Sequence, residues 1–400
     1  MNSSTIGLEI SMQYPYAKHN INEDDINAVV DVLKNKSITQ GKKVEEFEYE
    51  LASYLSSKYV VACSSGTAAL HLIYLAMGLD KNTAIITTPI TFLATAHAAR
   101  LTGAKVHFAD VDKDTGLILV DSVHKILKNA KNKIKALVIV HLGSKTCDLE
   151  KYKSIADEYN IHLIEDSCHA FGEKYISKQN KSSMVGSAKY SYATALSFHA
   201  IKNITTGEGG AVITNNKKFA DKIKLLRSHG SVRDNVWNDK AGRGPWYYQS
   251  SLIGYNYRIT DFQSALGISQ LKRLDKQNKY KYSLANIYNE LLKDTKHIKL
   301  PVIKDKKFDQ AWHLYSIALN FKSIGKTRNQ VMKKLLEKGI GTQVHYIPLY
   351  KQPVYKSKLN KKFPGAEIYY RSTLSLPMYP SLLEKDIKYI VKSLKEVLFN

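Results

Sequence analysis

The 400-residue chain has only three cysteines, Cys63, Cys147 and Cys168, and no CxxC spacing. Their odd number and scattered positions exclude a disulfide framework and give no pattern for a zinc site. The simplest interpretation is that they are small buried side chains. The sequence therefore predicts a cytoplasmic protein, kept in a reducing compartment, with no bound metal.

Long hydrophobic runs are also missing. No apolar stretch approaches the roughly 20 residues that a membrane-spanning helix needs. The first residues, MNSSTIGLEISMQYPY, lack both a basic region and a continuous apolar region, so no signal peptide is expected. We expect a loose N-terminal extension over 1–15 and no membrane association.

Acidic residues are outnumbered: 59 Lys and Arg stand against 36 Asp and Glu, which gives a formal net charge of +23. Such a charge raises the possibility of a nucleic-acid-binding protein. The lysines, however, are scattered singly and in pairs, and no basic helix with interleaved aromatics is present. A solvated basic surface explains the charge better, and its positive field would favour an anionic small-molecule substrate.

Apolar β-branched runs, by contrast, are plentiful in the first half and alternate with helical patterns. The continuous apolar character of these runs is typical of strands that are covered on both faces. Seven runs predict strands, at 59–63, 84–89, 105–111, 136–142, 161–166, 193–199 and 211–215. Helical patterns at 67–78, 91–103 and 149–159 lie between several of them. This alternation predicts a mainly parallel α/β sheet of about seven strands.

The pattern changes after residue 216. A helix is expected over 219–230 and one or two long helices over 260–294, with Thr260 or Asp261 as the N-cap. The remainder has the apolar segments of a smaller α+β domain. We therefore divide the chain into the extension at 1–15, a large domain at 16–270 and a small C-terminal domain at 271–400.

The stretch SFHAIKNITTGEGGA, residues 197–211, places Lys202 just past a predicted strand. Ligands bind at this end of the strands in α/β sheets. A partly desolvated lysine there has a lowered pKa and can act as a nucleophile. A surface lysine remains the alternative, whereas a P-loop is excluded because GxxxxGK[ST] is missing.

Two other strand ends carry polar residues. The run CSSGTAALHL leads from a strand through Ser65, Gly66 and Thr67 into a helix, whose N-terminus is a ready anion site. In LIEDSCHA, Asp166 ends an apolar strand and His169 follows it. A carboxylate in that position needs a cationic partner, such as a protonated pyridine nitrogen. A capped helix and a capping Asp are the ordinary alternatives.

Two further residues, an aromatic and an asparagine, add to the candidate ligand-binding residues at the strand ends. Phe92, in TTPITFLATA, follows a strand and could stack on a flat ring or belong to the core. Asn256 occupies a polar turn before a helix. An anion site, a stacking aromatic, a strand-end Asp and a lysine match the phosphate, ring, nitrogen and aldehyde of pyridoxal 5′-phosphate (PLP). The set as a whole predicts a PLP site.

These segments resemble the DegT/DnrJ/EryC1/StrS family of nucleotide-sugar aminotransferases. The similarity runs from Tyr14 to the C-terminus and includes ITQGKKVEEFE, SSGTAALHL, TTPITFLATA, IEDSCHAFG, SFHAIKNITTGEGGAVITN, LRSHG and GYNYRITDFQSALG. Ala200 stands where proline is more usual, and Ser167-Cys168 replaces a small Ala-Ala pair; neither change removes a functional group. The resemblance implies the type I aminotransferase fold of PLP-dependent transferases.

The resemblance also implies roles for individual residues. Lys202 matches the lysine that bonds to PLP, Asp166 the partner of the ring nitrogen, His169 the neighbour of the ring hydroxyl and Phe92 the stacking aromatic. Phosphate contacts are implied for the segment Ser65, Gly66 and Thr67, for Ser197, and for Asn256 of a second subunit in a homodimer. Contacts to the sugar nucleotide are implied for Tyr16, Lys36, Ser37, Ile38, Thr39, Gln343, Val344, His345 and Tyr346.

The implied reaction moves an amino group from L-glutamate to a nucleotide-linked 4-keto-6-deoxysugar. The segments GPWYYQ, AWHLY, IGTQVHYIPLY and AEIYYRSTLSLP are most similar to the branch that aminates UDP-2-acetamido-2,6-dideoxy-β-L-arabino-hex-4-ulose in pseudaminic acid synthesis. The alternative is a sister enzyme acting on another such sugar, of the perosamine or viosamine type. Lys202 argues against the dehydratases of the family, in which a histidine replaces the lysine.

Overall fold

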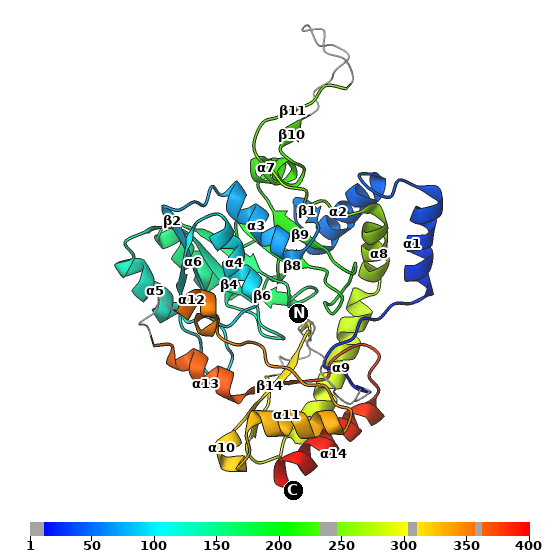
Figure 1. The fold of residues 1–400 in the computed structure, drawn as a ribbon, viewed down its shortest axis with the longest axis vertical. Coiled ribbons are helices and arrows are strands. Elements are labelled where there is room, and N and C mark those ends of the chain that lie inside the picture. Colours follow the sequence, from blue (N-terminus) through cyan, green and yellow to red (C-terminus); the bar gives the residue numbers. More distant parts are fainter. Residues whose placement is uncertain (1–11, 233–245, 303–309, 357–361) are drawn as a thin grey trace, which may run out of the picture.

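The structure is a computed structural model that describes residues 12–232, 246–302, 310–356 and 362–400. Its larger part is built on a seven-stranded sheet with the strand order β1-β9-β8-β5-β4-β2-β3 (Figure 1). The strands are β1 (Tyr59–Cys63), β2 (Thr83–Thr87), β3 (Lys105–Phe108), β4 (Lys133–Val140), β5 (His162–Asp166), β8 (Ala193–Ser197) and β9 (Gly210–Thr214). All seven predicted strands are confirmed; six of them run in the same direction, and β9 runs opposite to them.

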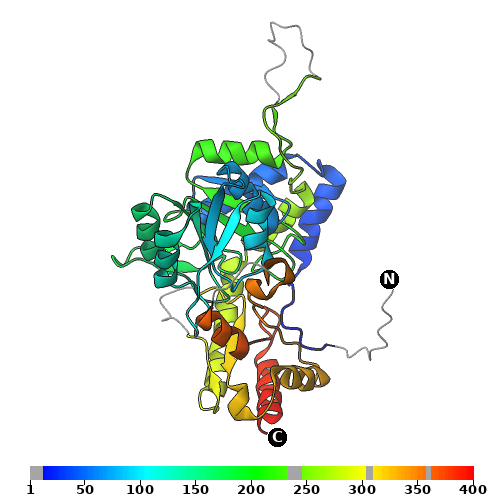
Figure 2. The same ribbon diagram turned by 60° about the vertical axis from the view of Figure 1, so that its left-hand side comes forward.

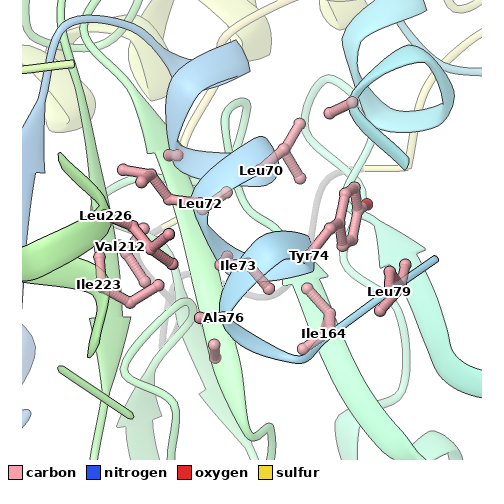
Figure 3. Packing of buried hydrophobic residues seen from close by; sticks show 14 of the residues in the cluster. Leu70, Leu72, Ile73, Tyr74, Ala76, Leu79, Ile164, Val212, Ile223 and Leu226 are labelled. Carbon is pink, nitrogen blue, oxygen red and sulfur yellow. The ribbon is translucent and has the colours of Figure 1, made fainter. Parts of the chain in front are cut away.

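Helices cover both faces of this sheet because alternate strand residues point to opposite sides. On one face, Val138 and Ile164 pack against three helices, with the side chains of α3 at the centre (Figure 3). On the other face, Leu137 and Ile139 pack against α5 and α6, while Ala211 and Ile213 pack against α2 and α8. The first group is α3 (Gly66–Ala76), α4 (Leu93–Leu101) and α7 (Lys217–Arg227), and the second is α2 (Lys42–Leu55), α5 (Val120–Asn129), α6 (Leu149–Glu158) and α8 (Asp261–Leu271).

A second body forms around a small antiparallel sheet with the order β12-β13-β14. Its own apolar cluster joins this sheet to four helices. The elements are β12 (Ile298–Lys299), β13 (Tyr315–Leu319), β14 (Thr373–Leu376), α9 (Leu274–Leu292), α10 (Phe321–Ile324), α11 (Arg328–Glu337) and α14 (Glu384–Phe399). Figure 2 shows this body at the opposite end of the molecule from the large sheet's α7.

The remaining elements connect or flank these bodies. The helix α1 (Glu23–Asn35) packs along α8. The C-terminal helices α12 (Pro353–Lys356) and α13 (Pro364–Ser372) supply Tyr355 and Tyr369 to a cluster on the large body. Two ribbons pair β6 (Lys174–Ile176) with β7 (Ser182–Met184), and β10 (Ser231–Val232) with β11 (Gln249–Ser250). The latter ribbon projects beyond α7 (Figures 1 and 2).

Three expectations about boundaries can be compared with these elements. Thr260 is the N-cap of α8, as predicted, and its side chain accepts a hydrogen bond from Gln263. The expected loose extension differs at Tyr14, whose backbone exchanges hydrogen bonds with Gly339 and Gly341, while 1–11 lies outside the described residues. The domain boundary at 270/271 stays a prediction.

Among the described residues, no helix has both the length and the apolar character to cross a membrane.

Candidate active site

A cavity of about 630 Å³ opens at the carboxyl ends of the parallel strands. Ligand sites in α/β sheets form at this edge because several strand ends converge there. Residues of the second body, including His313, close it from the opposite side. Thirteen residues predicted from the sequence line the cavity: Tyr16, Ser65, Gly66, Thr67, Phe92, Asp166, His169, Ser197, Lys202, Gln343, Val344, His345 and Tyr346.

Lys202 is part-buried in this cavity, in the turn that follows β8. Its backbone N–H donates to the His199 carbonyl at 2.9 Å, which directs the side chain inward from a closed turn. Its Nζ lies 3.5 Å from His313 Nε2. Burial lowers the pKa of the Lys202 amine, against the opposing effects of Cys168 and Asp166. A lysine in this setting keeps a reactive lone pair more readily than one in water.

Asp166 is the last residue of β5 and is 6% exposed. Its Oδ2 accepts a hydrogen bond from Thr95 Oγ1 at 2.7 Å, and its Oδ1 accepts one from the Cys168 N–H at 3.3 Å. Among the described residues it forms no ion pair. A buried carboxylate without a cationic partner is costly, so the cavity is suited to a ligand that brings positive charge to Asp166.

The N-terminus of α3 faces the cavity through Gly66 and Thr67. Ser65 is the N-cap, and its Oγ accepts a hydrogen bond from the Ala68 N–H at 3.1 Å. A Cβ added to Gly66 would come within 2.8 Å of Ser197 Cβ, so only glycine allows the helix end to approach this strand end. The first N–H groups of the helix and the Ser197 hydroxyl thus surround one point, as an anion requires.

Aromatic rings form the wall beside Asp166. Phe92 is the N-cap residue of α4 and is 57% exposed although it is apolar. Its centroid lies 6.2 Å from that of Tyr346, whose hydroxyl lies 3.0 Å from His169 Nε2. A ring left open to a cavity between other rings can stack on a flat ligand.

Three histidines surround Lys202 and are held neutral. Burial lowers the pKa of His169 and of His313 well below the ordinary value, and lowers that of His345 to about 3. The positive charge of Lys202 acts in the same direction on all three. The Gly143 N–H donates to Nδ1 of His169 at 3.3 Å, so the proton of this neutral ring is on Nε2, beside Tyr346.

Five predicted site residues do not line the cavity of their own chain. Asn256 is exposed on the segment that follows β11, where it pairs with Ser228. The other four, Lys36, Ser37, Ile38 and Thr39, are exposed in the turn between α1 and α2. The two groups lie near one another, because Thr39 is bridged to Thr260 and the Ile38 carbonyl accepts the Asp261 N–H at 2.9 Å.

The structure also brings in cavity residues that were not predicted. They are Thr91, Thr95, His141, Cys168, His199, Glu208, His313 and Gln352, among others. Most lie inside segments that were recognised, such as TTPITFLATA and AWHLY, but the pattern gave no reason to separate Thr95 or His313 from their neighbours. Within the described ranges, no group of three His, Cys, Asp or Glu side chains is arranged to hold a metal ion.

The residues that converge here fit PLP. Gly66 leaves room for an anion at the end of α3, Phe92 exposes its side chain, and Lys202 presents a desolvated amine. Asp166 is buried and forms no ion pair within the part of the chain that the structure describes. Each group suits a different part of the cofactor. An ordinary structural role explains each residue alone, but not their convergence on one cavity.

Known proteins share this architecture over nearly the whole chain. Residues 19–395 match the model of the DegT/DnrJ/EryC1/StrS aminotransferase family. The chain is 37% identical over 384 residues to the UDP-4-amino-4,6-dideoxy-N-acetyl-beta-L-altrosamine transaminase of Campylobacter jejuni, covering 96% of this chain and 97% of the relative.

Solved structures agree with that match. Helicobacter pylori PseC, an aminotransferase involved in the biosynthesis of pseudoaminic acid, superposes with a TM-score of 0.86 at 32% identity, over 96% of this chain and 99% of that one. The PLP-form of Spr1654 from Streptococcus pneumoniae superposes with a TM-score of 0.83 at 26% identity, over 96% and 98% of the two chains.

Proposed function

Because the chain belongs to the DegT/DnrJ/EryC1/StrS aminotransferase family, we propose that it is a PLP-dependent sugar-nucleotide aminotransferase. The amino donor is L-glutamate, and the acceptor is UDP-2-acetamido-2,6-dideoxy-β-L-arabino-hex-4-ulose, which becomes the 4-amino sugar. The convergence of Lys202, Asp166 and the α3 N-terminus on one cavity carries this proposal. The C. jejuni relative, which is named as an altrosamine transaminase, supports the choice of sugar.

The groups around the cavity support a role for each residue in binding the cofactor. Lys202 would bond to PLP, Asp166 would face its ring nitrogen, and Phe92 would stack on the ring. Ser65, Gly66, Thr67 and Ser197 would hold the phosphate, and His169 would be the neighbour of the ring hydroxyl. When bound, PLP supplies an aldehyde that exchanges amines and a ring that accepts electrons.

The protein's own part in the chemistry is to bind the substrates and move protons. Lys202 Nζ takes the proton from the α-carbon of the donor in the first half-reaction and delivers one to C4 of the sugar in the second. The pKa of Lys202, lowered by burial, favours the free amine that this role requires. Asp166 holds the positive charge at the ring nitrogen, and Tyr16 with the segment 343–346 contacts the sugar nucleotide.

We further propose a homodimer in which each chain completes the other's site. The segment that carries Asn256 also exposes large apolar side chains: Ile253 is 91%, Trp246 74% and Tyr248 62% exposed. Such a surface is typical of one that a partner covers. A second copy of the chain would place Asn256 at the partner's phosphate site, and the nearby segment 36–39 at its sugar site.

The three free cysteines fit a cytoplasmic location.

Two measurements test the function. Borohydride reduction of the purified protein should fix PLP on Lys202, which peptide mass spectrometry locates; Lys202→Ala should lose both the adduct and turnover. Incubation with L-glutamate and the UDP-linked ketosugar should yield the amino sugar. Turnover of a GDP- or dTDP-linked 4-keto-6-deoxysugar instead would favour the sister enzyme. A protein that binds DNA in a salt-dependent manner and takes up no PLP would refute the enzyme altogether.

A further inference from the structure

Two threonine hydroxyls lead to Asp166 through the protein interior. Thr95 Oγ1 lies 2.7 Å from Asp166 Oδ2, and Thr91 Oγ1 lies 2.7 Å from Thr95 Oγ1. Thr95 is fully buried and Thr91 is 2% exposed. We call these two side chains the hydroxyl chain. Both come from the turn that begins α4, and neither was singled out by the sequence.

The direction of the hydroxyl chain follows from its chemistry. An ionised carboxylate only accepts hydrogen bonds, and each hydroxyl carries one proton. Thr95 therefore donates its proton to Asp166 Oδ2, and Thr91 donates to Thr95. The Tyr74 hydroxyl donates to the Thr95 carbonyl at 3.1 Å, which fixes the backbone from which Thr95 reaches the carboxylate.

This arrangement distinguishes the two oxygens of Asp166. Oδ2 accepts a short, charge-assisted hydrogen bond from Thr95 Oγ1. Oδ1 accepts a longer hydrogen bond, from the Cys168 N–H at 3.3 Å, and the weakly donating Cys168 thiol also interacts with the carboxylate. Oδ1 therefore retains capacity for another donor, while rotation of the carboxylate would break the Thr95 hydrogen bond.

We propose that Thr95, supported by Thr91, is a positioning residue that locks the Asp166 carboxylate in the orientation in which Oδ1 receives the N–H of the cofactor's ring nitrogen. This inference rests on the proposed function, because it needs PLP in the cavity. A threonine that merely filled space would act equally well as valine. The positioning role requires the hydroxyl, so the two explanations differ in what an isosteric substitution does.

The experiment compares Thr95→Val with Thr95→Ser and with a matched control. The control is Thr87→Val, because Thr87 is also fully buried near this edge of the sheet and its hydroxyl donates to the Val138 carbonyl at 3.0 Å rather than to Asp166. The readouts are the PLP dissociation constant and the chemical shift of ¹⁵N in the ring of labelled PLP, which reports the protonation of the ring nitrogen.

We expect Thr95→Val to weaken PLP binding by about tenfold or more, as for a lost hydrogen bond to a charged group, and to move the ¹⁵N signal towards the unprotonated position. Thr95→Ser should restore both, and Thr87→Val should change neither. If Thr95→Val does not fold, Thr91→Val should show a smaller change in the same direction.

Three results would overturn the inference: an unchanged affinity and ¹⁵N shift in Thr95→Val, the same changes in Thr87→Val, or, where Thr95→Val does not fold, unchanged values in Thr91→Val. Each of them leaves the proposed function intact if the unaltered protein binds PLP on Lys202. An unaltered protein that binds no PLP would instead refute the proposed function and this inference with it.

Discussion

Lys281 is a buried amine with no acidic partner among the described residues, and its substitution should change how stability depends on pH. It lies on α9, is 4% exposed, and its Nζ donates to Asn203 Oδ1 at 2.7 Å. Burial lowers its pKa from 10.5 to about 7. Asn203 follows Lys202 directly in the chain, so this amine supports the segment on which the reactive lysine is held.

The sign of the effect follows from proton binding. In the unfolded chain Lys281 is protonated below about pH 10.5, whereas in the folded protein it is protonated only below about pH 7. Between these values the unfolded state binds more protons, so the stability of the native protein rises with pH by up to about 1.4 kcal/mol per unit. Over the whole window the cost approaches about 5 kcal/mol.

Lys281→Met keeps the aliphatic stem and removes the titrating group. At pH 10 the two proteins should be about equally stable, because the roughly 1 kcal/mol lost with the Asn203 hydrogen bond offsets the roughly 0.8 kcal/mol that neutralising the lysine still costs there. At pH 7 the variant should be more stable by about 3 kcal/mol, because the cost of neutralising a buried lysine is gone. The stability advantage of the variant should therefore disappear between pH 7 and pH 10.

Urea unfolding of the protein without cofactor, followed by circular dichroism at pH 7, 8, 9 and 10, measures the difference between the two proteins. Other groups titrate equally in both and drop out of that difference. Lys153→Met is the control, since the Lys153 side chain is 43% exposed and its amine pairs with Asp157 at the surface. A stability difference that stays constant across these pH values, or a control variant that shows the same pH-dependent difference, would refute this reasoning.

Two further predictions concern the cofactor site and the dimer. Gly66→Ala should cost about 1–3 kcal/mol, because its Cβ would lie 2.8 Å from Ser197 Cβ, and should reduce PLP affinity when binding is titrated by absorbance. Gly207→Ala is its control: a Cβ there meets nothing within 4 Å, so only the strain of its φ of +76° should appear, without a change in affinity. Lys202→Ala and Asn256→Ala should each be inactive, yet co-refolding them should restore about a quarter of the activity, because one site in each mixed dimer is complete. No recovery on mixing would show that Asn256 does not act across a subunit interface.

Much of the large sheet could be predicted because strands covered on both faces are continuous apolar runs. The predicted strand at 59–63 has the bounds of β1, and the others differ by a few residues, as at 136–142, where β4 extends over Lys133–Val140. The direction of β9 could not be predicted, because apolar character does not depend on the direction in which a strand runs. Lys133 begins β4 although it is exposed, which an apolar pattern cannot indicate.

The candidate site likewise contains residues that could be predicted from the sequence and residues that could not. Lys202, Asp166 and the Ser65–Gly66–Thr67 turn could be predicted because each carries unusual chemistry directly after an apolar strand. Thr95 could not, because a threonine at the start of a helix is ordinary until a carboxylate from β5 lies 2.7 Å from it. Lys281 likewise looks like any lysine of a surface helix in a chain with 59 basic residues.

The sequence alone thus determined the fold class, the order of the strands along the chain, and the residues whose chemistry matches PLP, because these depend on local patterning and residue type. Tertiary structure decided which residues share the cavity. It set Thr95 and His313 beside Asp166 and Lys202, left Asn256 and 36–39 outside the cavity of their own chain, and buried Lys281. The physical reason is that burial and distance fix pKa values and hydrogen bonds, and both arise only when segments far apart in the chain pack together.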